Sequence, residues 1–321
     1  MTISDKSIKD FLERYYLKCD PTLNVETFGR YRREARKRFP DWLSAMELKH
    51  QMEELYTPAE IKAISTSKRI PPKEEHLIPF DGDKFKFAFI TDTHFGAKCF
   101  NEDVWNSIVD EINKSDVDMV IHTGDITNGC DKRKEDMVFS LTHIGYAEQK
   151  AYAIDLLSKI NKPIYAVSGN HDRFFFKSCG ALIVEDIAHE LDNFHYLGED
   201  TADLIINNEL LGRGENPRGI RIRLWHGEDA SGSATSSRLQ SLVGSFSRND
   251  YPDILLCGHT HKQCYLFERD VHVLSGGAVC GQSSWMKSKK LVNHQGFHMV
   301  EVEYNERGVT KFSPTWYPFY S

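Results

Sequence analysis

The feature that most limits how this chain can fold is an alternation of short apolar runs and helical segments that begins at Lys84. Five apolar runs, each typical of a buried strand, span residues 85–90, 119–121, 164–167, 220–225 and 254–256. Between the first three lie residues 102–114 and 151–160, which suit helices. This alternation predicts a layered α/β domain with a largely parallel sheet. Residues 299–304 and 309–312 predict a hairpin that completes a second sheet.

Polar side chains that can ligate a metal follow each of the five runs. They are Asp92, His94, Asp125, Asn170, His226, His259 and His261. Any one of these histidines alone would more often be a structural or surface residue. Because the carboxyl ends of parallel strands meet at one edge of a sheet, however, we expect these side chains to converge. Carboxylates, imidazoles and an amide oxygen favour manganese, iron or zinc, and seven ligands fit two ions that share a carboxylate.

These motifs, taken in order, resemble the calcineurin-like metallophosphoesterase superfamily. The matching elements are Asp92-Thr93-His94, Gly124-Asp125, Gly169-Asn170-His171-Asp172, His226 and Gly258-His259-Thr260-His261. The resemblance spans roughly residues 84–305 and implies a four-layer α/β/β/α sandwich. It also implies that Asp92, His94 and His261 hold one metal, that Asn170, His226 and His259 hold the second, and that Asp125 bridges them.

The resemblance has one departure. Repair nucleases of this superfamily often place a catalytic histidine shortly after Gly-Asp, whereas Ile126-Thr127-Asn128-Gly129 stands here. Phage-type phosphoesterases with a helical N-terminal segment and a Trp-His-Gly-Glu-Asp stretch, here residues 225–229, fit this chain better.

The resemblance implies hydrolysis by a hydroxide that bridges two divalent ions, with manganese favoured and iron, zinc or nickel as alternatives. His171 lies beside a ligand in the sequence and can steady a phosphoryl oxygen or protonate the leaving oxygen. Asp172 is a candidate to orient His171, although a structural aspartate that caps the loop is an equal alternative. Arg173 and Asn128 are candidates to contact a substrate phosphate, against the alternatives of a surface arginine and a turn asparagine.

The first 50 residues differ in charge from the rest of the chain. They carry 11 Lys/Arg against 8 Asp/Glu, whereas the remaining 271 residues carry 29 against 39. Apolar side chains at helical spacing predict two helices around a turn at Asp20-Pro21, the first carrying Ile8 and Leu12 and the second Phe28 and Tyr31. Four cations are expected on the face opposite the second apolar stripe, and they are Arg32, Arg33, Arg36 and Lys37. The pair resembles a helix-turn-helix that binds nucleic acid, and a helical cap with a solvated basic face is the alternative.

We therefore expect three parts: a helical segment over residues 1–50, a linker over 51–83 and a metallophosphoesterase domain over 84–321. Pro71-Pro72 favours an extended spacer within the linker. The seven cysteines are odd in number and form no Cys-x-x-Cys pair, which argues against a disulfide framework and a zinc ribbon. The N-terminus lacks the apolar core of a signal peptide, and no apolar run approaches membrane-spanning length. These features predict a cytoplasmic protein without a membrane partner.

Three functions are open at this point. The first is a phosphodiesterase that acts on nucleic acid or nucleotides, which the basic N-terminal helix favours. The second is a phosphomonoesterase or protein phosphatase that uses the same metal site. The third is a DNA-binding regulator whose esterase domain has decayed, and the full ligand set speaks against it.

Overall fold

The computed structural model describes residues 4–18, 25–40, 42–43, 46–47, 75–131, 135–207, 219–227, 235–247, 251–305 and 307–319. The chain divides into two compact units, residues 1–72 and residues 73–321. The expected proline-rich spacer before residue 75 lies outside the described residues.

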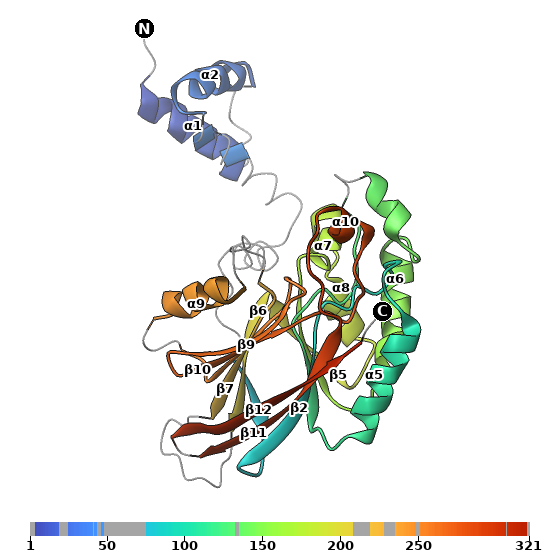
Figure 1. The fold of residues 1–321 in the computed structure, drawn as a ribbon. Helices are drawn as coiled ribbons and strands as arrows, with labels where there is room; N and C mark the ends of the chain where they lie inside the picture. The colour runs from blue at the N-terminus through green and yellow to red at the C-terminus, as the bar shows by residue number, and fades with distance from the viewer. Residues whose placement is uncertain are drawn as a thin grey trace. The chain divides into compact units, whose positions relative to one another are not determined.

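The N-terminal unit contains the two helices that the sequence predicts. They are α1 (Asp5–Lys18) and α2 (Val25–Arg38) (Figure 1). Ile8 and Leu12 of α1 are fully buried together with Ala35 of α2. The rings of Tyr15 and Phe28 stack with their centroids 3.8 Å apart. The apolar stripes of the two helices therefore form a small core of their own.

The larger unit is built on two six-stranded sheets. In spatial order, the first sheet consists of β12 (Gly308–Pro318), β11 (Gly296–Asn305), β2 (Lys84–Ile90), β3 (Met119–His122), β4 (Ile164–Ser168) and β5 (Phe194–Glu199). The second consists of β1 (Glu75–Pro79), β6 (Thr201–Asn207), β7 (Ile220–Trp225), β8 (Ile254–Cys257), β10 (Val271–Gly276) and β9 (Gln263–Glu268). All five predicted strands are present, and β11 and β12 form the predicted hairpin.

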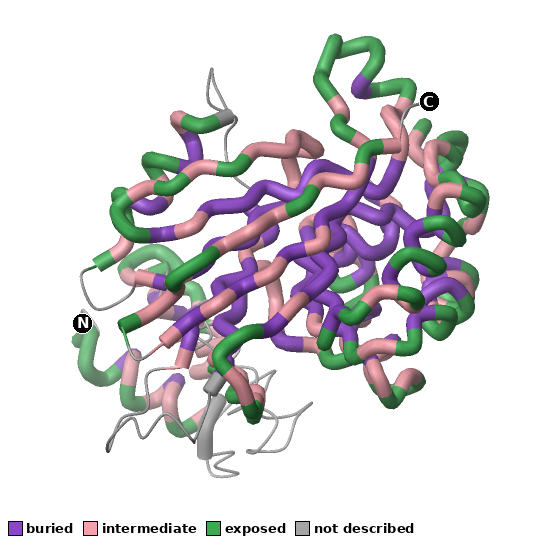
Figure 2. Tube along the Cα trace, turned by 60° about the horizontal axis from the view of Figure 1, so that its bottom comes forward, coloured by how far each residue is buried: buried purple, intermediate pink, exposed green. Residues whose placement is uncertain are grey.

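Helices complete a four-layer arrangement (Figure 1). The helices α5 (Glu102–Lys114), α6 (Tyr146–Leu157) and α8 (Ile183–Ala188) cover the first sheet, and α9 (Thr235–Ser245) covers the second. One apolar core lies between the two sheets, and another lies between each sheet and its helices. Figure 2 shows the buried residues along the strands and the exposed ones mainly on helices and loops. The predicted α/β/β/α sandwich is confirmed.

The sheets are mixed rather than largely parallel. The strands β2, β3, β4 and β5 run parallel, whereas β11 pairs with both β2 and β12 in antiparallel fashion. In the second sheet, β6–β7 and β9–β10 are antiparallel pairs. Short connections account for the antiparallel pairs β9–β10 and β11–β12, because consecutive strands joined by a tight turn must reverse direction. The polar strand ends still meet, because the strands that carry them are the parallel central ones.

The last part of the expected linker, residues 51–83, contains a strand. Residues 75–79 form β1 and pair with β6. The strand alternates exposed and half-buried residues, and only its pairing with β6 distinguishes this pattern from an extended spacer. No helix in the described part of the chain combines the length and hydropathy needed to cross a bilayer.

Candidate metal centre

The polar strand ends from both sheets meet at one place. Asp92 and His94 follow β2, Asp125 follows β3, and Asn170 follows β4 in the first sheet. In the second sheet, His226 follows β7, and His259 and His261 follow β8. The two sheets thus contribute side chains to a shared site, as the sequence predicts.

Five of these residues have a left-handed backbone. The φ angles are 51° at Asp92, 47° at His94, 53° at Asp125, 69° at His259 and 56° at His261. Residues other than glycine rarely adopt this backbone conformation, and each such residue costs on the order of 1–3 kcal/mol. Such strain collects where surrounding structure holds functional groups in place. The turns after β2, β3 and β8 are therefore shaped to aim these side chains inward.

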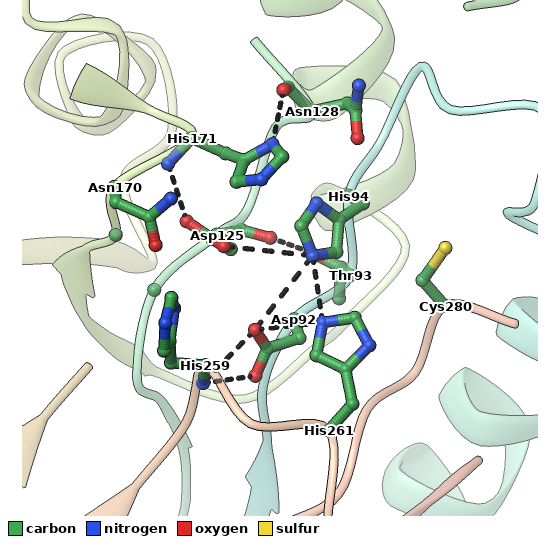
Figure 3. A network of polar contacts seen from close by, with 12 residues as sticks. Asp92, Thr93, His94, Asp125, Asn128, Asn170, His171, His259, His261 and Cys280 are labelled. Atoms are coloured by element: carbon green, nitrogen blue, oxygen red, sulfur yellow. Dashed lines mark hydrogen bonds and ion pairs between the residues drawn. The ribbon is translucent and has the colours of Figure 1, made fainter. Parts of the chain in front are cut away.

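The first cluster contains Asp92, His94 and His261, whose ligand atoms all lie within 4.8 Å of one another. Nε2 of His94 lies 3.2 Å from Nε2 of His261, and Nε2 of His261 lies 3.3 Å from Oδ1 of Asp92 (Figure 3). Asp92 is fully buried. Two imidazole nitrogens and a buried carboxylate that face one point form a donor set suited to a divalent cation.

The second cluster contains Asp125, His226 and His259, again within 4.8 Å of one another. Oδ1 of Asn170 lies 2.9 Å from Nε2 of His226, so the amide oxygen joins this group. The imidazole of His226 is fully buried.

Asp125 faces both clusters with its two carboxylate oxygens. Oδ2 lies 3.7 Å from Nε2 of His94, and Oδ1 lies 3.3 Å from Nε2 of His226. Asp125 itself is 2% exposed. This single carboxylate is therefore in the position of a bridge between two cation sites.

The sequence profile of calcineurin-like phosphoesterases matches residues 85–263, which include β2 through β8 and all seven of these side chains. The chain belongs to the calcineurin-like phosphoesterase family.

Individual relatives are distant. The DNA polymerase II small subunit of Methanothermobacter thermautotrophicus is 23% identical over 271 residues, which cover 71% of this chain and 53% of that protein. The chain therefore spans about half the length of this curated relative. Among solved structures, an archaeal phosphodiesterase has a TM-score of 0.42 and 18% identity over 73% of this chain and all of its own. Vps29 of Entamoeba histolytica, solved with zinc, has a TM-score of 0.37 and 17% identity over 74% of this chain and all of its own.

The residues of this calcineurin-like phosphoesterase fit divalent cations. Burial tends to raise the pKa of Asp92, but the imidazoles of His261 and His226 hold this pKa below its ordinary value. Burial likewise lowers the pKa of His226, but Asp125 outweighs it and raises this pKa to about 10. Buried carboxylates thus require positive charge beside them, and without a metal the imidazoles supply it by holding protons. A divalent cation would take the place of those protons.

Two residues that the sequence does not reveal orient the metal-facing imidazoles. Oδ1 of Asn293 accepts a hydrogen bond from Nδ1 of His261 at 2.8 Å, and the carbonyl of Thr123 accepts one from Nδ1 of His226 at 2.8 Å. With hydrogen on Nδ1, each Nε2 would present its lone pair to a cation that displaces the Nε2 proton. No sequence signal marks Asn293, because it lies 32 residues after His261.

His171 lies beside Asp125 and His94. Its backbone N–H donates to Oδ1 of Asp125 at 2.8 Å, and its ring forms a T-shaped contact with that of His94, with centroids 4.6 Å apart. Its Nδ1 donates to the backbone carbonyl of Asn128 at 2.7 Å (Figure 3). The Asn128 carbonyl therefore orients His171 and leaves its Nε2 free of this hydrogen bond. The ligand atoms of His171, His94 and Asp125 also lie within 4.8 Å of one another.

Asp172 contacts the loops rather than the ring of His171. Its carboxylate accepts hydrogen bonds from the backbone N–H groups of Gly169 and Thr127 at 2.8 Å and from that of Ile126 at 3.2 Å. Burial and nearby Asp125 raise the pKa of Asp172 to about 6, against the effect of these donors. This geometry matches the loop-capping alternative. Arg173 lies at the start of α7 (Arg173–Cys179) and forms an ion pair with Asp200 at 3.7 Å.

The four N-terminal cations are not equivalent. Arg33, Arg36 and Lys37 are exposed on α2. Arg32 is half-buried, and its Nε lies 2.6 Å from Oε1 of Glu47. The basic surface of α2 therefore rests chiefly on the first three.

Proposed function

We propose that this chain is a metal-dependent phosphodiesterase that cleaves phosphodiester bonds of nucleic acid or nucleotides at a centre of two divalent ions. The observation that carries the proposal is the placement of Asp125, whose two oxygens face the two clusters at 3.7 and 3.3 Å. A carboxylate shared in this way is the feature that makes two adjacent cation sites rather than one.

Two bound divalent ions would activate water and stabilise the phosphoryl oxygens during an in-line displacement. Asp92, His94 and His261 would hold one ion, Asn170, His226 and His259 the other, and Asp125 both. Manganese is the first ion to test, followed by iron, zinc and nickel.

His171 is proposed as the group that assists the leaving oxygen. Because the Asn128 carbonyl fixes the Nδ1 hydrogen, Nε2 is the nitrogen that can carry and transfer a proton. Asp172 is proposed as a positioning residue. Its carboxylate accepts hydrogen bonds from the backbone N–H groups of residues 126, 127 and 169, and so holds the neighbouring Asp125 and Asn170 in place relative to each other.

The choice of nucleic acid rests on two observations. The relative from Methanothermobacter thermautotrophicus is a DNA polymerase subunit, and α2 presents Arg33, Arg36 and Lys37 to solvent. Exposed cations of this kind attract the phosphate backbone without sequence preference.

A substrate panel tests the proposal. Metal-loaded protein is assayed on single-stranded DNA, double-stranded DNA, RNA, cyclic nucleotides, bis-aryl phosphate and aryl phosphate. We expect manganese-dependent cleavage of diesters, with cleavage of at least one nucleic acid or nucleotide. Hydrolysis confined to the aryl monoester would replace this proposal with a phosphomonoesterase, and no hydrolysis of any substrate would reject it.

A further inference from the structure

The segment between β10 and β11 exposes aromatic and aliphatic side chains that the proposed reaction does not use. It spans residues 281–293, includes α10 (Ser284–Ser288) and is named here the Trp285 loop. Trp285 is 61% exposed, Leu291 39% and Val292 50%. Tryptophan contributes a large apolar area when it is covered, so an exposed one beside other apolar side chains indicates a binding surface.

Three lysines accompany this tryptophan. Lys287, Lys289 and Lys290 are all exposed, and within the described residues none of them forms an ion pair. The chain as a whole has a formal net charge of −7. A local group of three positive charges on an acidic protein favours an anionic ligand.

The Trp285 loop is joined to the metal centre at both ends. Just before its start, the backbone N–H of Cys280 donates to the carbonyl of Asp92 at 3.0 Å. At its end, Asn293 bonds Nδ1 of His261 at 2.8 Å, and the next N–H, of His294, donates to the carbonyl of His261 at 2.8 Å. The exposed side chains are thus a short chain distance from two proposed metal ligands.

Internal contacts hold the loop in this shape. The hydroxyl of Ser283 accepts the N–H of Met286 at 3.2 Å and caps α10. Met286 is 8% exposed and anchors the helix. Nε2 of Gln282 donates to the carbonyl of Leu291 at 2.6 Å, which closes the loop. Trp285 and the lysines are therefore presented on a fixed support.

We infer that the Trp285 loop binds single-stranded nucleic acid next to the scissile bond, with a base stacked on Trp285 and backbone phosphates contacted by Lys287, Lys289 and Lys290. This inference rests on the proposed function and narrows its substrate class. Stacking on an open aromatic ring requires an unpaired base, and lysines that follow the backbone need no sequence preference.

An anionic membrane surface also attracts tryptophan and lysine. Nucleic acid is favoured because the loop is bonded to a centre suited to phosphodiesters, and a strand lying in that centre would continue past it. The test includes vesicles so that the two ligands are distinguished.

The experiment measures binding of the full chain to a fluorescein-labelled oligothymidylate of about 12 nucleotides, within the usual range of site sizes. Its linkages are phosphorothioates, which resist cleavage. We expect Trp285→Ala to weaken binding about tenfold, equivalent to about 1.4 kcal/mol, and Trp285→Phe to weaken it less, because phenylalanine retains a stacking face. Replacing the three lysines with alanine should reduce the slope of log binding constant against log salt concentration by about 2. This value assumes three lost phosphate contacts at about 0.7 each for a single strand.

Two control variants match these changes elsewhere on the protein. Phe267→Ala removes an aromatic side chain that is 57% exposed on β9. Alanine at Lys114, Lys150 and Lys159, which pair with carboxylates beside α5 and α6, removes the same charge. Both controls should bind the oligonucleotide as the wild type does.

Equal oligonucleotide binding by wild type, Trp285→Ala and the triple-lysine variant would overturn the inference. The inference would also be overturned if these variants lost binding to vesicles of phosphatidylserine and phosphatidylcholine but kept wild-type binding to the oligonucleotide. Hydrolysis of bis-aryl phosphate by wild type tests the proposed function separately. Absence of hydrolysis with Trp285-dependent binding would reject the proposed function and keep the loop as a nucleic-acid surface.

Discussion

Gly169 lies where the loop after β4 packs closely against the loop after β3, and we predict that Gly169→Ala damages both stability and the metal centre. A methyl group at this position would lie 2.2 Å from Oδ1 of Asp125 and 2.3 Å from its backbone nitrogen. Side-chain carbons do not approach other atoms within 3.0 Å, so a backbone segment must move. Overpacking of this kind costs about 1–3 kcal/mol.

For a unit of this size, that cost corresponds to a fall in Tm of about 2–12 °C. The group forced to move is the carboxylate proposed to serve both ions, and a displacement of about 1 Å can cost about 10²-fold in rate. Thermal unfolding, metal content after manganese loading and turnover of bis-aryl phosphate measure the three effects.

Gly244→Ala is the matched control in the same unit. Its methyl group would meet nothing closer than the guanidinium of Arg269 at 3.8 Å, an ordinary contact. Because Gly244 lies within α9, alanine should stabilise the unit by up to about 1 kcal/mol. A Gly169→Ala variant with wild-type Tm, metal content and turnover would refute the reasoning.

Three further predictions concern separate parts of the molecule. His171→Ala should lower turnover by a factor of about 10²–10⁴ while leaving metal content nearly intact, and loss of a metal in this variant would show that His171 is itself a ligand. Replacing Arg33, Arg36 and Lys37 with alanine should weaken duplex DNA binding and flatten its log–log salt slope by up to about 2.7, from about 0.9 per phosphate, and an unchanged slope would identify α2 as a solvated cap. His298 is 1% exposed, and burial lowers its pKa to about 3, so between pH 6.5 and 3 the unfolded chain binds a proton that the folded chain excludes. His298→Phe should therefore gain about 1.4 kcal/mol of unfolding free energy relative to wild type for each unit by which the pH falls below about 6.5, and a pH-independent difference in denaturant unfolding would contradict this.

The sequence predicts a layered α/β domain and the convergence of the seven candidate ligands because both depend on local pattern, whereas the four-layer sandwich follows from the family resemblance. An apolar run that ends in a small residue and then Asp, Asn or His identifies a strand and its polar end without knowledge of partners. This pattern alone predicts the positions of Asp125 and Asn170 at strand ends.

Features that depend on distant partners could not be predicted. Asn293 orients His261 through a contact across 32 residues, with β9, β10 and α10 between them in the sequence. The strand β1 is defined by its pairing with β6, more than a hundred residues later. A loop-capping Asp172 is one of two alternatives from the sequence, but the sequence does not indicate that two of its three backbone N–H donors come from the loop after β3. Likewise, Arg32 pairs with Glu47 although helical spacing places it with the exposed cations.

The central claim is that Asp125 joins two cation sites, and metal content measured by mass spectrometry on wild type and Asp125→Asn tests it most directly. After manganese loading and removal of free metal, wild type should retain about two ions per chain, as seven ligands require. Asp125→Asn should retain fewer, because the amide keeps only one oxygen and no charge for two sites. One ion or none per wild-type chain, or two ions in both proteins, would contradict the claim.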